Sequence, residues 1–325
     1  MHLFKTKVTL ASVLCLFATA VIAQEVNEAE LKPLPAVHSP IAKKAEVISA
    51  AWAGERVVSV GDHGIVLLSD DQGKTYRQAK SVPVSSQLTS VSFIDSKKGW
   101  AVGHWGAILV TEDAGETWKI QRLDTNVDRP LFAVNFSDAL HGTAIGLWSL
   151  VLSTEDGGKT WIKRELEPPA NRKKADLNLY SLFSSVSGTL YATAEKGQVL
   201  TSSNRGATWK YIDTGYKGSL WAGAVLPSGE LLVAGQRGSL MKGSSDGSQW
   251  EKVTIDTTSS ITSITVHEQN VLLTGLDGFL SMSNDAAKQF TALKKAGEYS
   301  YTWGLLSPKG LPVLFSRTGV VPNSK

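Results

Sequence analysis

The chain has 325 residues, of which 42% are hydrophobic and 19% are charged, and its formal net charge is +3. The apolar fraction excludes a disordered chain, and the small net charge excludes the basic field that nucleic-acid binding needs. The single cysteine, Cys15, excludes a disulfide scaffold and a multi-cysteine metal centre. The combination of 10 Trp with 29 Gly is instead typical of repetitive β proteins.

Residues 1–23 have the features of a secretory signal peptide. Two lysines precede an apolar run over residues 8–20, and a small residue, Ala23, stands before the expected cleavage point. The run is shorter than the roughly 20 apolar residues that span a bilayer, so cleavage is favoured over a membrane anchor. Cleavage removes Cys15 and leaves nearly equal numbers of basic and acidic residues. We therefore predict a cysteine-free protein that is periplasmic or secreted.

A single unit then repeats to the end of the chain. Each copy has a turn residue, a short apolar strand and, in six copies, an aromatic residue twelve positions later. The turn residues are Gly64, Gly106, Ser149, Gly197, Gly238, Gly278 and Gly319. Their spacing of 40 to 48 residues is typical of β-propellers, in which each repeat forms one four-stranded blade. We predict an all-β, seven-bladed propeller over residues 45–325.

The seventh repeat stops after Val321, too early to include its outer strands. Residues 24–44 precede the first full repeat, and within them residues 31–41 are the natural donor of a missing strand. We therefore predict that N- and C-terminal strands close the ring within one blade. Pro33 and Pro35 restrict the donated strand to an edge position.

The hairpin between the third and fourth strands of each repeat carries an Asp-box, with the pattern Ser/Thr-x-Asp-x-Gly-x-Thr-aromatic. The carboxylate can accept hydrogen bonds from the turn, the glycine can adopt a positive φ, and the aromatic ring can pack between blades. We expect this motif to serve the fold, and not a metal or a catalytic pair. Its residues, including decayed copies, are Asp71, Gly73, Tyr76, Asp113, Gly115, Trp118, Asp156, Gly158, Trp161, Asn204, Trp209, Trp250 and Asp285.

The opposite face is built from the turns between second and third strands and from the connections between blades. Large or charged residues occupy these turns, where Gly, Asn or Asp would be usual. The predicted partner-binding face consists of His63, His104, Trp105, Trp148, Arg129, Lys196, Arg237 and Arg317. A zinc site at the two histidines would lack a third ligand, so no metal is expected.

Two of the ten tryptophans have no evident role in the fold. Trp105 and Trp148 occupy equivalent turns on neighbouring blades, where we expect them to lie side by side as an interface hot spot. The alternative is that each packs over its own turn. The other eight have core or turn explanations, and among these Trp221 and Trp303 fall on first strands.

Residues 99–118 combine a Gly-Trp strand, a Gly-x-x-Gly turn and an Asp-box in one run. With such units the chain resembles, over residues 45–321, the photosystem II stability/assembly factor family of neuraminidase-repeat propellers. The resemblance implies a non-enzymatic monomer, without cofactor or small-molecule substrate, that binds a partner protein and assists assembly or stability of a membrane or envelope complex. Photosynthetic members use an arginine patch, for which Arg237 and Arg317 are the nearest candidates; this chain can come from a non-photosynthetic bacterium.

A sialidase-like glycoside hydrolase, or a carbohydrate-binding propeller, is the alternative, since both carry the same boxes. Sialidases clamp a carboxylate with arginines, the first in an Arg-Ile-Pro segment, whereas Arg56 here begins a strand in Gly-Glu-Arg-Val-Val. The acidic residues on the turn face, Asp62, Glu195 and Asp277, belong to separate blades and form no pair for acid/base chemistry. We therefore predict that the protein is not an enzyme.

Overall fold

The computed structural model describes residues 32–170, 172–294 and 298–322. The predicted signal peptide, residues 1–23, lies outside this range, and so do residues 24–31 of the segment 24–44. Among the described residues, no helix has the length and apolarity needed to cross a bilayer.

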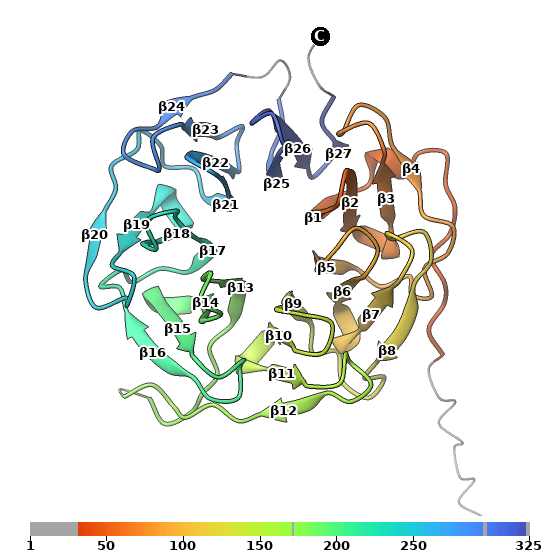
Figure 1. The fold of residues 1–325 in the computed structure, drawn as a ribbon, viewed down its shortest axis with the longest axis horizontal. Helices are drawn as coiled ribbons and strands as arrows, with labels where there is room; N and C mark the ends of the chain where they lie inside the picture. Colours follow the sequence, from red (N-terminus) through yellow and green to blue (C-terminus); the bar gives the residue numbers. More distant parts are fainter. Residues whose placement is uncertain (1–31, 171, 295–297, 323–325) are drawn as a thin grey trace, which may run out of the picture. The chain divides into compact units, whose positions relative to one another are not determined.

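Seven antiparallel sheets are arranged around a central axis (Figure 1). The prediction of an all-β, seven-bladed propeller is therefore confirmed. Six blades have four strands, and the seventh has three within the described residues. Each blade runs in chain order from an inner first strand to an outer last strand, so the repeat in the sequence is also the repeat in space.

Blades one to three contain β1 (Val47–Ala53), β2 (Arg56–Gly61), β3 (Val66–Ser69), β4 (Arg77–Gln78), β5 (Leu88–Phe93), β6 (Gly99–Gly103), β7 (Ile108–Thr111), β8 (Lys119–Arg122), β9 (Leu131–Phe136), β10 (Gly142–Gly146), β11 (Val151–Thr154) and β12 (Ile162–Arg164). Blades four and five contain β13 (Leu179–Ser184), β14 (Leu190–Ala194), β15 (Gln198–Ser202), β16 (Lys210–Asp213), β17 (Leu220–Val225), β18 (Leu231–Gly235), β19 (Leu240–Gly243) and β20 (Trp250–Lys252). Blades six and seven contain β21 (Ile261–His267), β22 (Asn270–Gly275), β23 (Leu280–Ser283), β24 (Thr291–Ala292), β25 (Tyr301–Leu306), β26 (Pro312–Ser316) and β27 (Gly319–Val320). The short 3-10 segments are η1 (Ala42–Lys44), η2 (Asp62–Gly64), η3 (His104–Gly106), η4 (Leu147–Ser149), η5 (Glu195–Gly197) and η6 (Gln236–Gly238).

The core lies between neighbouring blades. The second strand of a blade is covered on both faces, so β6, β10, β14 and β18 are buried along their whole length and their sequences are small or apolar throughout. Trp100 of β6 stacks on Phe136 of β9, with ring centroids 3.4 Å apart and planes 5° apart. This contact joins blade two to blade three, as similar apolar clusters join the other blades.

Within the described part of the chain, the expected strand exchange in blade seven is not observed. Residues 32–41 form no strand; the amide of Ala36 donates to the carbonyl of Val82 over 3.0 Å, and the side chain of Gln78 donates to the carbonyl of Val37 over 2.9 Å. This segment therefore follows the residues after β4 of blade one instead of completing blade seven. The physical reason is proline, because Pro33, Pro35 and Pro40 lack the N–H groups that a paired strand needs.

Blades seven and one nevertheless meet, through the same contacts that join other blades. The hydroxyl of Thr302 in β25 donates to the carbonyl of Val47 in β1, as that of Thr262 donates to Tyr301 over 3.0 Å. Strands from the two ends of the chain therefore close the ring by packing side by side. At the turn end of this joint, a Cβ on Gly319 would overlap the carbonyl oxygen of Lys43.

We predict that Gly319→Ala lowers the free energy of unfolding by several kcal/mol more than Gly215→Ala. Both glycines have positive φ, so both variants incur backbone strain of about 1–2 kcal/mol. Only at Gly319 does the added methyl also meet backbone, because no atom lies within 4 Å of the corresponding position at Gly215. Urea unfolding of the two variants measures the difference; equal losses would contradict the proposed closure contact.

Candidate partner-binding face

Six turns between second and third strands share one backbone shape, with a left-handed residue at the centre. The φ angles of these residues lie between 51° and 58°, and the residues are His63, Trp105, Trp148, Lys196, Arg237 and Asp277. A side chain in this region costs about 1–2 kcal/mol relative to glycine. Five of the six are neither Gly, Asn nor Asp, the residues that tolerate this region best. Strain of this kind, kept at large side chains, is typical of positions that serve a function.

The two tryptophans of this ring differ in exposure. Trp148 is 54% exposed, whereas Trp105 is partly buried. The backbone N–H of Trp105 donates to Asp128 over 2.7 Å, and that of Trp148 donates to Asn178 over 3.1 Å. The aromatic contacts of the described residues do not include a contact between the two indoles, and their role as one interface hot spot stays a prediction.

Two predicted face residues hold turns in place. Arg129 donates from Nε to the carbonyl of Leu147 over 3.2 Å and from Nη2 to that of Trp148 over 2.6 Å. Burial lowers the pKa of Arg129 below its usual value. His104 Nδ1 lies 2.9 Å from Asp128 Oδ2. Arg129 therefore holds the turn of Trp148, and His104 contacts the aspartate that holds the turn of Trp105.

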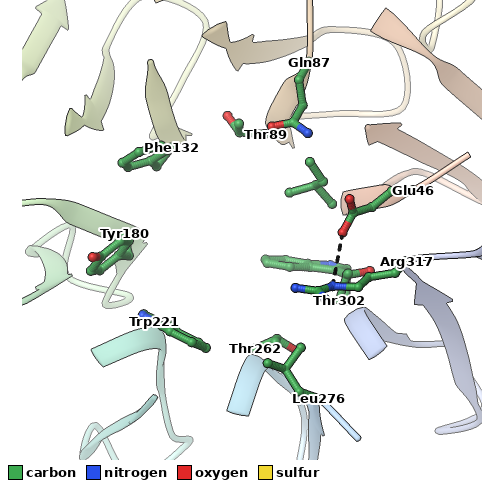
Figure 2. A pocket seen from close by; sticks show the side chains of 12 residues that line it. Glu46, Gln87, Thr89, Phe132, Tyr180, Trp221, Thr262, Leu276, Thr302 and Arg317 are labelled. Atoms are coloured by element: carbon green, nitrogen blue, oxygen red, sulfur yellow. Dashed lines mark ion pairs between the residues drawn. The ribbon is translucent and has the colours of Figure 1, made fainter. Parts of the chain in front are cut away.

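A cavity of about 470 Å³ opens on the axis at the same end of the ring (Figure 2). Every blade contributes the second residue of its first strand, and these residues are Ile48, Thr89, Phe132, Tyr180, Trp221, Thr262 and Thr302. At this residue the pairing register of first and second strands shifts in all seven blades. A β-bulge leaves a residue unpaired and re-aims its side chain, so repetition of the bulge directs one side chain per blade at the axis.

The wall of the cavity has two chemically different sides. Phe132 and Tyr180 stack across blades three and four, with centroids 6.0 Å apart and planes 20° apart, and Trp221 follows on blade five. Figure 2 shows Glu46 and Arg317 on the opposite side, where Arg317 Nε lies 3.8 Å from Glu46 Oε1. An aromatic wall facing a charged wall suits a peptide segment that carries both apolar and charged groups.

The charged side is only partly shielded from water. Burial, followed by the nearby carboxylate of Asp62, raises the pKa of Glu46, and Arg317 opposes this shift. The side chain of Arg317 is 63% exposed, so its guanidinium can contact a ligand without losing much hydration. Arg317 is the one predicted face residue that lines the cavity.

Sequence reasoning misses the aromatic wall. Phe132 and Tyr180 carry no predicted role, and Trp221 and Trp303, assigned to the core, also line the cavity. The signal is present in the repeat, because the cavity residues stand sixteen or seventeen positions before the turn residue of each unit. The sequence does not show the β-bulge, which directs the side chain of an apparently core-facing residue towards the axis.

The Asp-box turns lie at the other end of the ring. Asp156 accepts hydrogen bonds from the amide and hydroxyl of Thr160 over 2.9 and 2.7 Å and from the hydroxyl of Thr154 over 2.8 Å. Thr160 first, and then Thr154, lower the pKa of Asp156 to about 2. Asn204 in blade four makes the same turn, with its amide donating to Thr208. No group of three or more His, Cys, Asp or Glu among the described residues could hold a metal ion.

Fold and face together define a seven-bladed β-propeller with a pre-formed opening on its axis. The family model of the photosynthesis system II assembly factor YCF48 matches residues 17–112, 77–168 and 110–218. The chain therefore belongs to this family, and the resemblance seen in its repeats is confirmed.

Two solved structures share the fold. One, "YCF48 bound to D1 peptide", is 19% identical with a TM-score of 0.71, and the alignment covers 90% of this chain and 100% of that one. The other, YCF48 from Cyanidioschyzon merolae, is 15% identical with a TM-score of 0.68, covering 87% of this chain and 96% of that one. No curated protein matches the chain.

We predict that Trp148→Gly is more stable than Trp148→Ala by about 1 kcal/mol, because glycine relieves the left-handed strain and alanine does not. The reverse order is expected at Ile162, an exposed residue of β12, where glycine weakens a strand by roughly 0.5–1 kcal/mol relative to alanine. Urea unfolding of the four variants provides the test. If alanine is the better residue at position 148 too, the turn is not strained.

We further predict a loss of stability as the pH falls from about 4 towards 2. The pKa of Asp156 is about 2 in the folded protein, against an ordinary value of 3.8, so the unfolded chain takes up the proton first and is favoured in this window. Urea midpoints over this range should fall less steeply for Asp156→Asn. The control is Asp256→Asn, at an exposed residue, which should keep the full slope.

Proposed function

We propose that the protein is an exported, non-enzymatic propeller that binds a segment of a partner protein at its axial cavity and thereby assists assembly or stability of a membrane or envelope complex. The observation that carries the proposal is the set of seven bulges in register, which builds one cavity from all seven blades. Membership of the assembly-factor family supports it, and so does the related propeller, which is YCF48 bound to a D1 peptide.

The cavity is suited to binding because it needs little reorganisation. Its lining stands beside strands that are buried on both sides, so the aromatic side chains are already ordered before a ligand arrives. Pre-organisation of this kind reduces the entropy lost on binding. Large rings give contact area at a low entropic cost, and aromatic residues dominate binding energy at protein interfaces.

The acidic residues of the turn face support a non-enzymatic role. Glu195 accepts hydrogen bonds from the backbone and side-chain amides of Asn178, each over 3.1 Å, and Asp62 accepts one from Gln87. These carboxylates therefore hold connections between strands. Glu195 and Asp62 belong to different blades and form no pair with each other.

Export is the third part of the proposal and rests on the sequence of residues 1–23. A near-neutral mature chain without cysteine suits the periplasm or the exterior of the cell. A partner there is a membrane protein or an envelope complex, and we propose that the propeller meets it as a monomer.

We predict that Phe132→Ala combined with Trp221→Ala reduces affinity for the partner segment at least tenfold, since aromatic hot spots contribute about 2 kcal/mol or more each. The partner is to be identified by crosslinking to membranes of the source organism and mass spectrometry. Affinity is then measured with a synthetic peptide of the crosslinked segment.

Two further measurements define what would contradict this. The control is Ile162→Ala combined with Leu140→Ala, at exposed apolar residues away from the cavity, which should bind as the parent does. Unchanged affinity of the Phe132/Trp221 double variant would exclude the cavity as the binding site. Hydrolysis of a chromogenic sialoside by the purified protein would overturn the non-enzymatic role.

A further inference from the structure

The segment 32–45, called here the N-terminal strap, exposes apolar side chains. Leu34 is 70% exposed, Val37 is 77% exposed and Ile41 is 64% exposed. These three lie within eight residues of one another, whereas the other exposed large apolar residues of the described chain lie in or beside blades two, three, four and seven. A concentration of this kind marks an interaction surface, while single exposed residues need no explanation.

The strap is held firmly in this exposed position. Its amide at Ala36 donates to the carbonyl of Val82 over 3.0 Å, and Gln78 accepts from the amide of Ser39 over 2.9 Å. Beneath it lies a mostly apolar cavity of about 400 Å³, whose lining includes Val37, Ile41 and Ile65. The apolar side chains therefore have an ordered support, with unfilled apolar space beside them.

The charge of the strap has a single sign. Lys32, Lys43 and Lys44 are exposed and take part in none of the ion pairs of the described residues. No acidic residue occurs between residues 32 and 45, although Glu25, Glu28 and Glu30 precede this segment in the sequence and Glu46, which faces Arg317 at the axis, follows it. The surface is consequently apolar and basic at once.

We propose that the N-terminal strap docks the propeller on an anionic lipid bilayer, with its aliphatic side chains in the interfacial region and its lysines at the headgroups. Insertion of aliphatic groups together with attraction of lysines to anionic lipid is the combination that holds peripheral proteins on membranes. The lysine stems are long enough to keep the charge at the headgroups while the strap lies at the boundary.

The chemistry of the strap favours lipid over a protein partner. Its exposed residues are aliphatic, whereas Trp, Tyr and Arg carry the energy of protein interfaces. Its three prolines also prevent the addition of a strand from another chain, since they remove backbone donors. A fluid bilayer requires neither a paired edge nor a shaped pocket.

The position of the strap leaves the axial cavity accessible. Figure 1 shows its first part along the outside of blade one, beyond β4, and its last residues run to the turn end of the ring closure, where Lys43 lies against Gly319. The strap and the cavity share none of their residues. Membrane docking therefore does not depend on the proposed partner binding, and either can fail without the other.

The test is co-sedimentation with vesicles, using the chain from Gln24 onward, which keeps every strand of the propeller. We expect binding to vesicles of phosphatidylglycerol mixed with phosphatidylcholine, weaker binding at high salt, and little binding to phosphatidylcholine alone. Lys32→Gln, Lys43→Gln and Lys44→Gln together should reduce the partition coefficient by about fivefold per lysine. Replacement of Leu34, Val37 and Ile41 by serine should abolish binding.

Matched controls separate the strap from general surface effects. Serine at Leu140, Val186 and Leu311, which are exposed elsewhere, and glutamine at the exposed Lys119, Lys210 and Lys252 should leave binding unchanged. Equal losses in the controls, or no binding to any vesicle, would overturn the proposal and turn attention to a protein partner for the strap. The strap variants should retain full affinity for the peptide of the axial cavity.

Discussion

The joint between neighbouring blades is the constraint on which the rest of the structure depends. At four of the turns that follow second strands, the chain running to the neighbouring blade passes so close that a Cβ would overlap its backbone: Gly64 lies against Val84, Gly197 against Tyr216, Gly238 against Thr257 and Gly319 against Lys43. Glycine is required for this approach as well as for its positive φ. Because the same joint recurs at the closure, the ring needs no strand exchanged between its ends.

This joint also determines where function can be placed. It brings the start of each first strand to the axis, and the bulge there then directs one side chain into the opening. In six of the seven repeats the residue before the turn residue takes a left-handed conformation, as Trp148 and Arg237 do, and these turns lie at the same end of the ring. The scaffold therefore offers two rings of positions, inner and outer, whose side chains can vary without altering the blades.

The fold could be predicted from the sequence because the unit that forms one blade occurs seven times along the chain. Repeated glycines and box residues such as Asp113 and Trp118 mark turns whose hydrogen bonds are local, and local bonds leave a pattern at fixed spacing. The strand expected over residues 31–41 is not found over the described residues 32–41, because a segment that occurs once has no register to compare with, and its prolines prevent pairing instead of only limiting it. The place of Phe132 and Trp221 in the cavity could not be predicted, because a β-bulge depends on how two strands pair. The sequence of one strand does not show that pairing.

The bulged positions divide the ring into two functional parts. Where the residue is threonine, its hydroxyl binds the next blade: Thr89 donates to Leu131 over 2.6 Å, Thr262 to Tyr301 over 3.0 Å, and Thr302 to Val47 across the closure. Blades three to five carry aromatic rings instead and forgo this bond. Stacking of Phe132 on Tyr180 provides a contact between blades in its place. The aromatic wall thus occupies the part of the ring remote from the closure, where the continuous chain already links each blade to the next and a hydrogen bond can be exchanged for an aromatic surface that is open to the axis.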